Sequence, residues 1–118
     1  RSVIPWLFDG TLPDFNTGTN NGATCAPAIE AAIAGEAAAS GRTNVLNGRF
    51  KGGWTTRHYG RPTEGFHAIQ MELAQASHLT TETPPFALDL EKSAALRPAL
   101  IRMLARLTAL APHLAQKR

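Results

Sequence analysis

Residues 47–73 read NGRFKGGWTTRHYGRPTEGFHAIQMEL, and we expect the rest of the chain to serve as a scaffold around this stretch. Five glycines interrupt it, and glycine lets the backbone turn tightly or approach a ligand closely. Between residues 47 and 63 the stretch holds four cations and no acid: Arg49, Lys51, Arg57 and Arg61. Because a guanidinium binds a carboxylate or phosphate through two parallel hydrogen bonds, this pattern is typical of a site for an acidic ligand.

The end of this stretch, residues 66–73, predicts a β-strand. Alternation along an extended chain places Ile69 and Met71 on one face, and Gln70 and Glu72 side by side on the other. A carboxylate at the end of an otherwise apolar strand is costly to bury without a partner, so Glu72 is a candidate general base. The alternatives are a surface or salt-bridged role for Glu72 and a solvated face for the basic residues.

The chain before this stretch predicts a strand, a loop and a helix. Residues 2–8 are expected to form the short strand, and residues 9–22 a long polar loop, because they are rich in Gly, Pro, Asn and Asp. Thr24 is expected to cap a helix that runs through the alanine-rich segment. Gly41 is expected to end that helix.

Two further strands and a long helix complete the expected elements. Val45 and Leu46 begin one strand, and the β-prone residues 54–58 form another. From Asp89 onward, apolar residues recur at helical spacing and predict a single stripe: Leu96, Leu100, Met103, Leu107, Leu110 and Leu114. Strands that alternate with helices indicate an α/β architecture.

Composition limits the classes of protein that fit. The 118 residues suit one domain, and the net charge of +3 is divided into opposing blocks: residues 42–62 hold five bases and no acid, and residues 63–91 hold five acids and no Lys or Arg. Such blocks can neutralise each other, so the charge does not require a nucleic-acid partner. A single cysteine, Cys25, excludes an internal disulfide and suits a reducing cytoplasm. We expect no signal peptide and no membrane span.

The sequence resembles the N-formylglutamate amidohydrolases, zinc-dependent enzymes of histidine degradation. The resemblance rests on residues 47–75, on the upstream segment RSVIPWLFDGTLPDFNTGTNNGATC and on TPPFALD downstream, in the same order as in the family. It implies a central mixed sheet flanked by helices, similar to that of carboxypeptidase-type zinc exopeptidases. Residues 1–118 would then be the C-terminal part of a single domain of this family.

The resemblance also implies zinc-assisted hydrolysis of the formyl amide of N-formyl-L-glutamate to formate and L-glutamate. By position in the motif, Glu72 is the expected base, and His58 would polarise the carbonyl or orient that base. The expected substrate contacts come from five residues, with Arg57 first for the carboxylates: Arg57, Arg49, Asn47, Asn16 and Thr19. A surface turn is an equal alternative for Asn16 and Thr19. No zinc ligand is expected within this chain, because the family's ligands are expected mostly upstream.

Two other functions are considered. A truncated module that binds an acidic small molecule without catalysis fits the absence of an HExxH, HxxE or CxxC pair. A nucleic-acid partner is disfavoured, because only Phe50, Trp54 and Tyr59 are available to stack on bases within the basic stretch. The small acidic substrate, and the missing N-terminal half of the domain, are therefore the expected partners.

Overall fold

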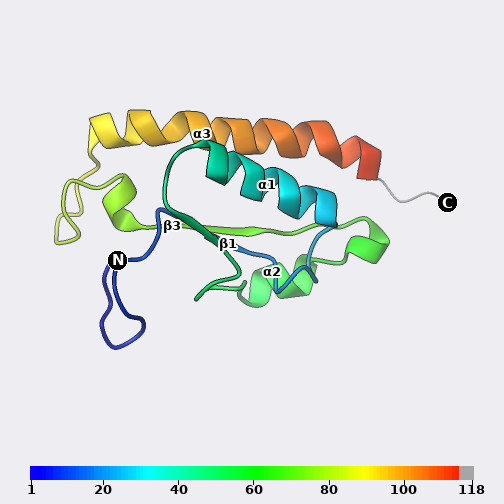
Figure 1. Cartoon of the computed structure of the whole chain (residues 1–118), viewed down its shortest axis with the longest axis horizontal. Helices are drawn as coiled ribbons and strands as arrows, with labels where there is room; N and C mark the ends of the chain where they lie inside the picture. Colours follow the sequence, from blue (N-terminus) through cyan, green and yellow to red (C-terminus); the bar gives the residue numbers. More distant parts are fainter. Residues whose placement is uncertain (115–118) are drawn as a thin grey trace.

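The computed structural model describes residues 1–114 and shows a small three-stranded sheet with helices (Figure 1). The strands are β1 (Phe15–Gly18), β2 (Asn44–Leu46) and β3 (Gln70–Leu73), and the helices are α1 (Pro27–Ala39), α2 (Trp54–Tyr59) and α3 (Leu90–Leu110). Three short 3-10 helices lie between or after them: η1 (Pro62–Glu64), η2 (Gln75–Ser77) and η3 (Ala111–Leu114). None of the helices within residues 1–114 is long and apolar enough to cross a membrane.

The sheet is mixed, with the strand order β2-β1-β3. β1 pairs in parallel with β2, which follows it through the crossover helix α1, and antiparallel with β3. In the antiparallel pair Phe15 lies opposite Leu73, and Asn16 lies opposite Glu72. This arrangement confirms the expected α/β class with a mixed sheet and helices, while the likeness to carboxypeptidases stays a prediction.

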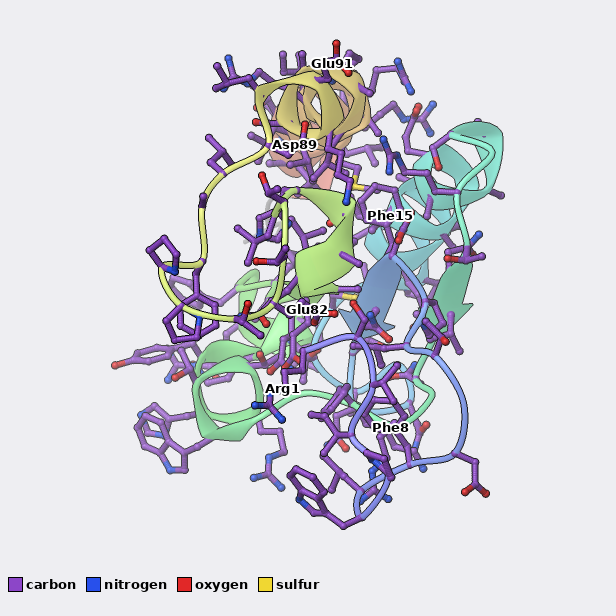
Figure 2. All side chains as sticks on the ribbon, turned by 90° about the vertical axis from the view of Figure 1, so that its left-hand side faces the viewer. Arg1, Phe8, Phe15, Glu82, Asp89 and Glu91 are labelled. Atoms are coloured by element: carbon purple, nitrogen blue, oxygen red, sulfur yellow. The ribbon has the colours of Figure 1, made fainter. Side chains whose placement is uncertain are left out.

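The core lies between the sheet and the helices α1 and α3, which cover one face. Phe15 from β1 packs there with Ile33 from α1, and with Leu96 and Met103 from α3. Figure 1 shows α3 above α1, with both on the same side of the strands, and Figure 2 shows Phe15 beneath them. The Asp89 side chain accepts a hydrogen bond from the Lys92 N–H and so caps α3. Of the apolar stripe predicted from the sequence, Leu96 and Met103 are buried on α3, Leu100 and Leu107 pack partly buried against the same core, and Leu114 lies in η3.

The expected strand at residues 2–8 is wrong, and part of the expected loop 9–22 is the central strand β1. Residues 2–8 turn instead, with the Leu7 N–H donating to the Ile4 carbonyl at 2.9 Å. The sequence FNTG of β1 has little β-propensity, yet all four residues are buried. Pairing on both sides therefore overrides local preference in β1.

The expected strand at residues 54–58 is also wrong, because these residues form the helix α2. Thr24 does not cap α1, whose N-cap is Ala26. The Thr24 hydroxyl instead donates to the Ala68 carbonyl at 2.7 Å and ties the chain before α1 to the chain before β3. β3 itself begins at Gln70, so it is shorter than the expected strand 66–73.

The segment after β3 is attached to the start of the chain. The Ser2 N–H donates to a carboxylate oxygen of Glu82, and the Arg1 amino group lies 3.8 Å from the same oxygen. Figure 2 shows Arg1 and Glu82 close together. A bridge between Leu79 and Leu88 closes this segment before α3 begins. These contacts hold the first two residues of the chain against the segment that follows β3.

Candidate functional site

A shallow hollow of about 320 Å³ lies where β3 meets the loop before α2. Its lining consists of Arg49, Phe50, Lys51, Gly52, Gly53, Gln70 and Glu72. Because Met71 and Leu73 pack against the core, alternation places Gln70 and Glu72 on the opposite face of the sheet. The structure therefore brings Glu72 together with Arg49 and Lys51, as the composition of residues 47–73 suggested.

Gln70 connects Glu72 to α2. Its Oε1 accepts a hydrogen bond from the Gly53 N–H at 2.7 Å and is 3.4 Å from the Thr56 hydroxyl. With the amide oxygen occupied in this way, the amide nitrogen of Gln70 donates to a carboxylate oxygen of Glu72. The half-buried Glu72 carboxylate is thus held at one oxygen, and the pair Gln70–Glu72 is oriented by the start of α2.

The loop that carries Arg49 and Lys51 lies directly against β1. The Asn20 N–H donates to the Lys51 carbonyl at 2.6 Å. A Cβ atom at position 18 would lie 2.6 Å from the Gly52 nitrogen and 2.7 Å from the Lys51 carbonyl carbon. Only glycine at position 18 therefore allows this close approach of loop and strand.

Asn47 and Thr19 form a partly buried hydrogen-bond network at the loop. The Asn47 amide accepts from the Thr19 N–H at 2.9 Å and donates to the Thr19 hydroxyl at 2.8 Å. That hydroxyl donates to Glu30 of α1 at 2.6 Å and accepts from the Gly22 N–H at 3.0 Å. Thr19 is 0% exposed, so its side chain supports the site from below and does not line the hollow.

Asn16 is likewise buried, at 2% exposure, on the strand beside Glu72. Its amide nitrogen donates to the Pro13 carbonyl at 2.8 Å and to the Glu72 carbonyl at 3.3 Å. Its Oδ1 has no hydrogen-bond partner among residues 1–114. Asn16 therefore leaves a buried acceptor without a donor on the sheet position next to Glu72.

Arg57 and His58 lie on the exposed side of α2 and do not line the hollow. The His58 ring stacks on Trp54, with the ring centres 4.2 Å apart. Because this segment is a helix, the buried Thr56 faces Gln70 while Arg57 and His58 are exposed. The structure therefore places both residues on the helix that anchors Gln70, without placing either beside Glu72.

A sequence model of the N-formylglutamate amidohydrolase family matches residues 1–79. The chain belongs to this family. It is 51% identical over 110 residues to the N-formylglutamate deformylase of Pseudomonas aeruginosa, and 58% identical over 87 residues to that of Pseudomonas putida. These alignments cover 92% and 73% of the chain, but only 41% and 32% of the relatives.

A solved structure supports the fold of this amidohydrolase-family chain. The crystal structure of an N-formylglutamate amidohydrolase from Ralstonia eutropha JMP134 superposes with a TM-score of 0.72 at 22% identity. The match covers 91% of the chain and 36% of the crystallised protein. The chain thus has a fold found within the family and spans well under half the length of the relatives it matches.

Within residues 1–114, this family member has no group of three or more His, Cys, Asp or Glu side chains that could hold a metal ion. Cys25 is buried, and burial raises the pKa of its thiol to about 11, with Glu30 adding to the rise. A neutral thiol is a poor metal ligand. These residues therefore do not fit a complete zinc site.

Sequence reasoning missed two features of the hollow. Lys51 lines it, although only its charge had been noted, and Gln70 anchors Glu72 to the Gly53 N–H. The signal for Gln70 was present, because its two-residue spacing from Glu72 on a strand places both side chains on one face. The anchoring of Gln70 could not be predicted from the sequence, because it depends on α2 being a helix that begins at Trp54.

Proposed function

We propose that the chain is a segment of an enzyme that hydrolyses the formyl amide of N-formyl-L-glutamate. Water adds to the formyl carbon, the C–N bond breaks, and the proton lost by water passes to the leaving nitrogen, giving formate and L-glutamate. The observation that carries this proposal is Glu72, held by Gln70 in a hollow beside Arg49 and Lys51. The identities of 51% and 58% to two N-formylglutamate deformylases support the choice of substrate.

Glu72 is proposed as the base that accepts the proton from water. One of its oxygens is occupied by the Gln70 amide, which leaves the other free to accept. Gln70 cannot rotate freely, because the Gly53 N–H holds its amide oxygen. A general base must be held within hydrogen-bond distance of the proton it takes, and this anchoring provides that positioning.

The two carboxylates of the substrate are proposed to bind the cations around the hollow. Arg49 and Lys51 line it, whereas Arg57 lies outside the lining, on α2 next to Thr56, the residue that contacts Gln70. We keep Arg57 as the first candidate for bidentate binding and Arg49 as the second. His58, next to Arg57 on α2, is proposed to contact the carbonyl group of the substrate.

The buried polar residues are proposed to act indirectly. Asn47 and Thr19 hold the loop that carries Arg49, through the network described above. Asn16 is proposed to offer its unpaired Oδ1 to a donor at the Glu72 end of the hollow. A cytoplasmic location is also proposed, because the free, buried Cys25 suits a reducing compartment.

Zinc dependence is proposed for the longer enzyme. Because the described residues do not form a three-ligand group, any zinc would need ligands from outside residues 1–114. When bound, zinc supplies Lewis-acid polarisation of a carbonyl and activation of water. The chain's own contribution is Glu72 and the basic residues around it.

A second candidate function is a module that binds a small acidic molecule without catalysis. The observation in its favour is that Arg49 and Lys51 line an open hollow while residues 1–114 lack a set of metal ligands. Such a module would bind glutamate and N-formyl-L-glutamate with similar affinity. It would release no formate from the formylated compound under any condition.

A chimera separates the two functions. In it, this chain replaces the matching 110 residues of the P. aeruginosa deformylase, which is 51% identical over that segment. We expect the chimera to release formate from N-formyl-L-glutamate, and the isolated chain to release none. A chimera that folds and binds the substrate, but releases no formate with zinc supplied, would favour the binding module.

A further inference from the structure

β3 is one of the two edge strands of the sheet, because it pairs with β1 on one side only. The Ala74 N–H donates to the Asp14 carbonyl of the chain that leads into β1. Because backbone groups alternate in direction along an antiparallel pair, the N–H and C=O groups of Glu72, two residues earlier, also point toward β1. The backbone groups of Met71 and Leu73 then face away from β1. No hydrogen bond to these groups is found among residues 1–114, so they are available to another strand.

An apolar groove lies between α3, α1 and the segment 65–71, and β3 contributes Met71 to its lining. It consists of two adjoining hollows of about 320 and 190 Å³, which share Ile69 and Leu107. Leu104 of α3 lines the second hollow, yet this side chain is 64% exposed. Figure 1 shows α3 running above β3, along about the same line but in the opposite chain direction. The layer between helix and sheet is therefore open along its side, and apolar surface remains uncovered.

His67 adds an unpaired donor to the first hollow. Its Nδ1 accepts a hydrogen bond from the Ala26 N–H at 2.9 Å, so the neutral ring holds its proton on Nε2. That Nε2 is buried and has no partner within residues 1–114. A buried donor without an acceptor is destabilising, so the groove lacks polar as well as apolar contacts.

We infer that a strand from the remainder of the family domain pairs with β3 at Met71 and Leu73 and covers this groove. The inference rests on the proposed function, in which the chain works within a longer enzyme. The chain spans 41% of the P. aeruginosa relative and 36% of the crystallised homologue, so most of each lies outside the match. Open, apolar sheet edges are normally covered in native proteins, and strand addition satisfies both the backbone and the groove.

The pairing has a consequence for the site. Side chains on one face of the added strand fill the groove beneath Leu104, and those on the other face lie beside Glu72. Directly paired residues on neighbouring strands have Cβ atoms about 4.5–5.5 Å apart. The added strand therefore contributes side chains beside Glu72, which lines the hollow.

Amide hydrogen exchange tests the pairing. In the isolated chain we expect fast exchange at the amides of Met71 and Leu73, and in the chimera at least tenfold slower exchange at both. The Glu72 amide, which faces β1, is the internal control and should change much less. Equal exchange at Met71 and Leu73 in chain and chimera would overturn the proposal.

A pair of matched variants tests the groove. Leu104→Glu places a charge in it, whereas Ile101→Glu places one on the same helix at 57% exposure, outside the residues that line either hollow. We expect Leu104→Glu to lower the Tm of the chimera and not that of the isolated chain, with Ile101→Glu neutral in both. Equal effects of the two variants in the chimera would overturn the proposal.

Co-expression provides a second measurement that does not require the chimera to fold. The chain is expressed with the rest of the P. aeruginosa deformylase as a separate tagged polypeptide. We expect copurification, abolished by Leu104→Glu and kept by Ile101→Glu. Self-association of the chain that Leu104→Glu abolishes would assign the groove to a second copy and overturn the proposal. A copurified complex of the two polypeptides that releases no formate would contradict the proposed function but not the strand pairing.

Discussion

At the scale of single residues, the site depends on one carboxylate and the amide that holds it. Gln70 is anchored to the Gly53 N–H and donates to Glu72, so the position of the carboxylate is set by a helix start about twenty residues earlier in the chain. The basic side chains are held less firmly, because Arg49, Lys51 and Arg57 are exposed. Catalysis should therefore be sensitive to Glu72, and affinity to the arginines.

The first residue-scale prediction concerns Glu72→Gln in the chimera. Glutamine keeps the shape and the hydrogen bonding, but does not accept a proton near neutral pH. Loss of a general base lowers kcat by about 10²–10⁴-fold, with binding largely retained, so we expect a decrease of at least about 100-fold at unchanged Tm. The matched control is Glu64→Gln, an exposed carboxylate paired with Arg61, which should leave kcat unchanged. A kcat within tenfold of the parent would place the base elsewhere.

The second prediction concerns Arg57→Lys in the chimera. Lysine keeps the charge but loses the two-pronged geometry, so binding of N-formyl-L-glutamate should weaken by about 1–3 kcal/mol, or about 5- to 150-fold in KM. Arg61→Lys is the control, because Arg61 pairs with Glu64 and stacks on Phe66. A KM within twofold of the parent for Arg57→Lys, together with a raised KM for Arg49→Lys, would transfer the role to Arg49.

At the scale of elements, the hollow exists because a loop lies against a strand. The loop 48–53 packs closely against β1 at Gly18, where any other residue would place a Cβ atom too near the loop backbone. The same loop places Arg49 and Lys51 beside Glu72. The contact also sets the start of α2, through the Gly53 N–H. A side chain at position 18 would therefore disturb both stability and the site.

Gly18→Ala should destabilise the isolated chain. The added methyl group would meet backbone atoms of Lys51 and Gly52 at 2.6–3.0 Å, so the loop must shift, at a cost of about 1–3 kcal/mol. Gly35→Ala is the matched control, because it lies within α1 with no atom within 4 Å of the added Cβ. It should instead stabilise by about 0.5–1 kcal/mol. Urea unfolding measures both, and equal effects would show that the loop does not rest on β1.

At the scale of the whole molecule, three features of the described residues bear on whether the proposed site is completed by other parts of a larger domain. The sheet has an uncovered edge at β3, the groove beneath α3 is apolar, and no group of metal ligands is present within residues 1–114. Each of these features is explained if the chain works as a segment of a larger domain.

The zinc content of the isolated chain and of the chimera tests whether the chain works as a segment of a larger domain. We expect the purified chain to hold less than about 0.1 zinc per molecule, and the chimera about one, because a tightly bound zinc needs three or four protein ligands. Elemental analysis after dialysis measures the ratio. One tightly bound zinc per isolated chain would contradict the prediction and would require ligands from these 118 residues.

The sequence by itself determined the α/β class, the helix stripe of α3, the family, and the position of Gln70 and Glu72 on one face of a strand. These follow from periodicity and from long matching segments, which do not depend on the rest of the fold. Tertiary structure alone decided that FNTG forms the central strand and that residues 54–59 form a helix. It also decided that Gly53 anchors Gln70, because strand pairing and loop packing join residues far apart in the chain and override weak local preferences.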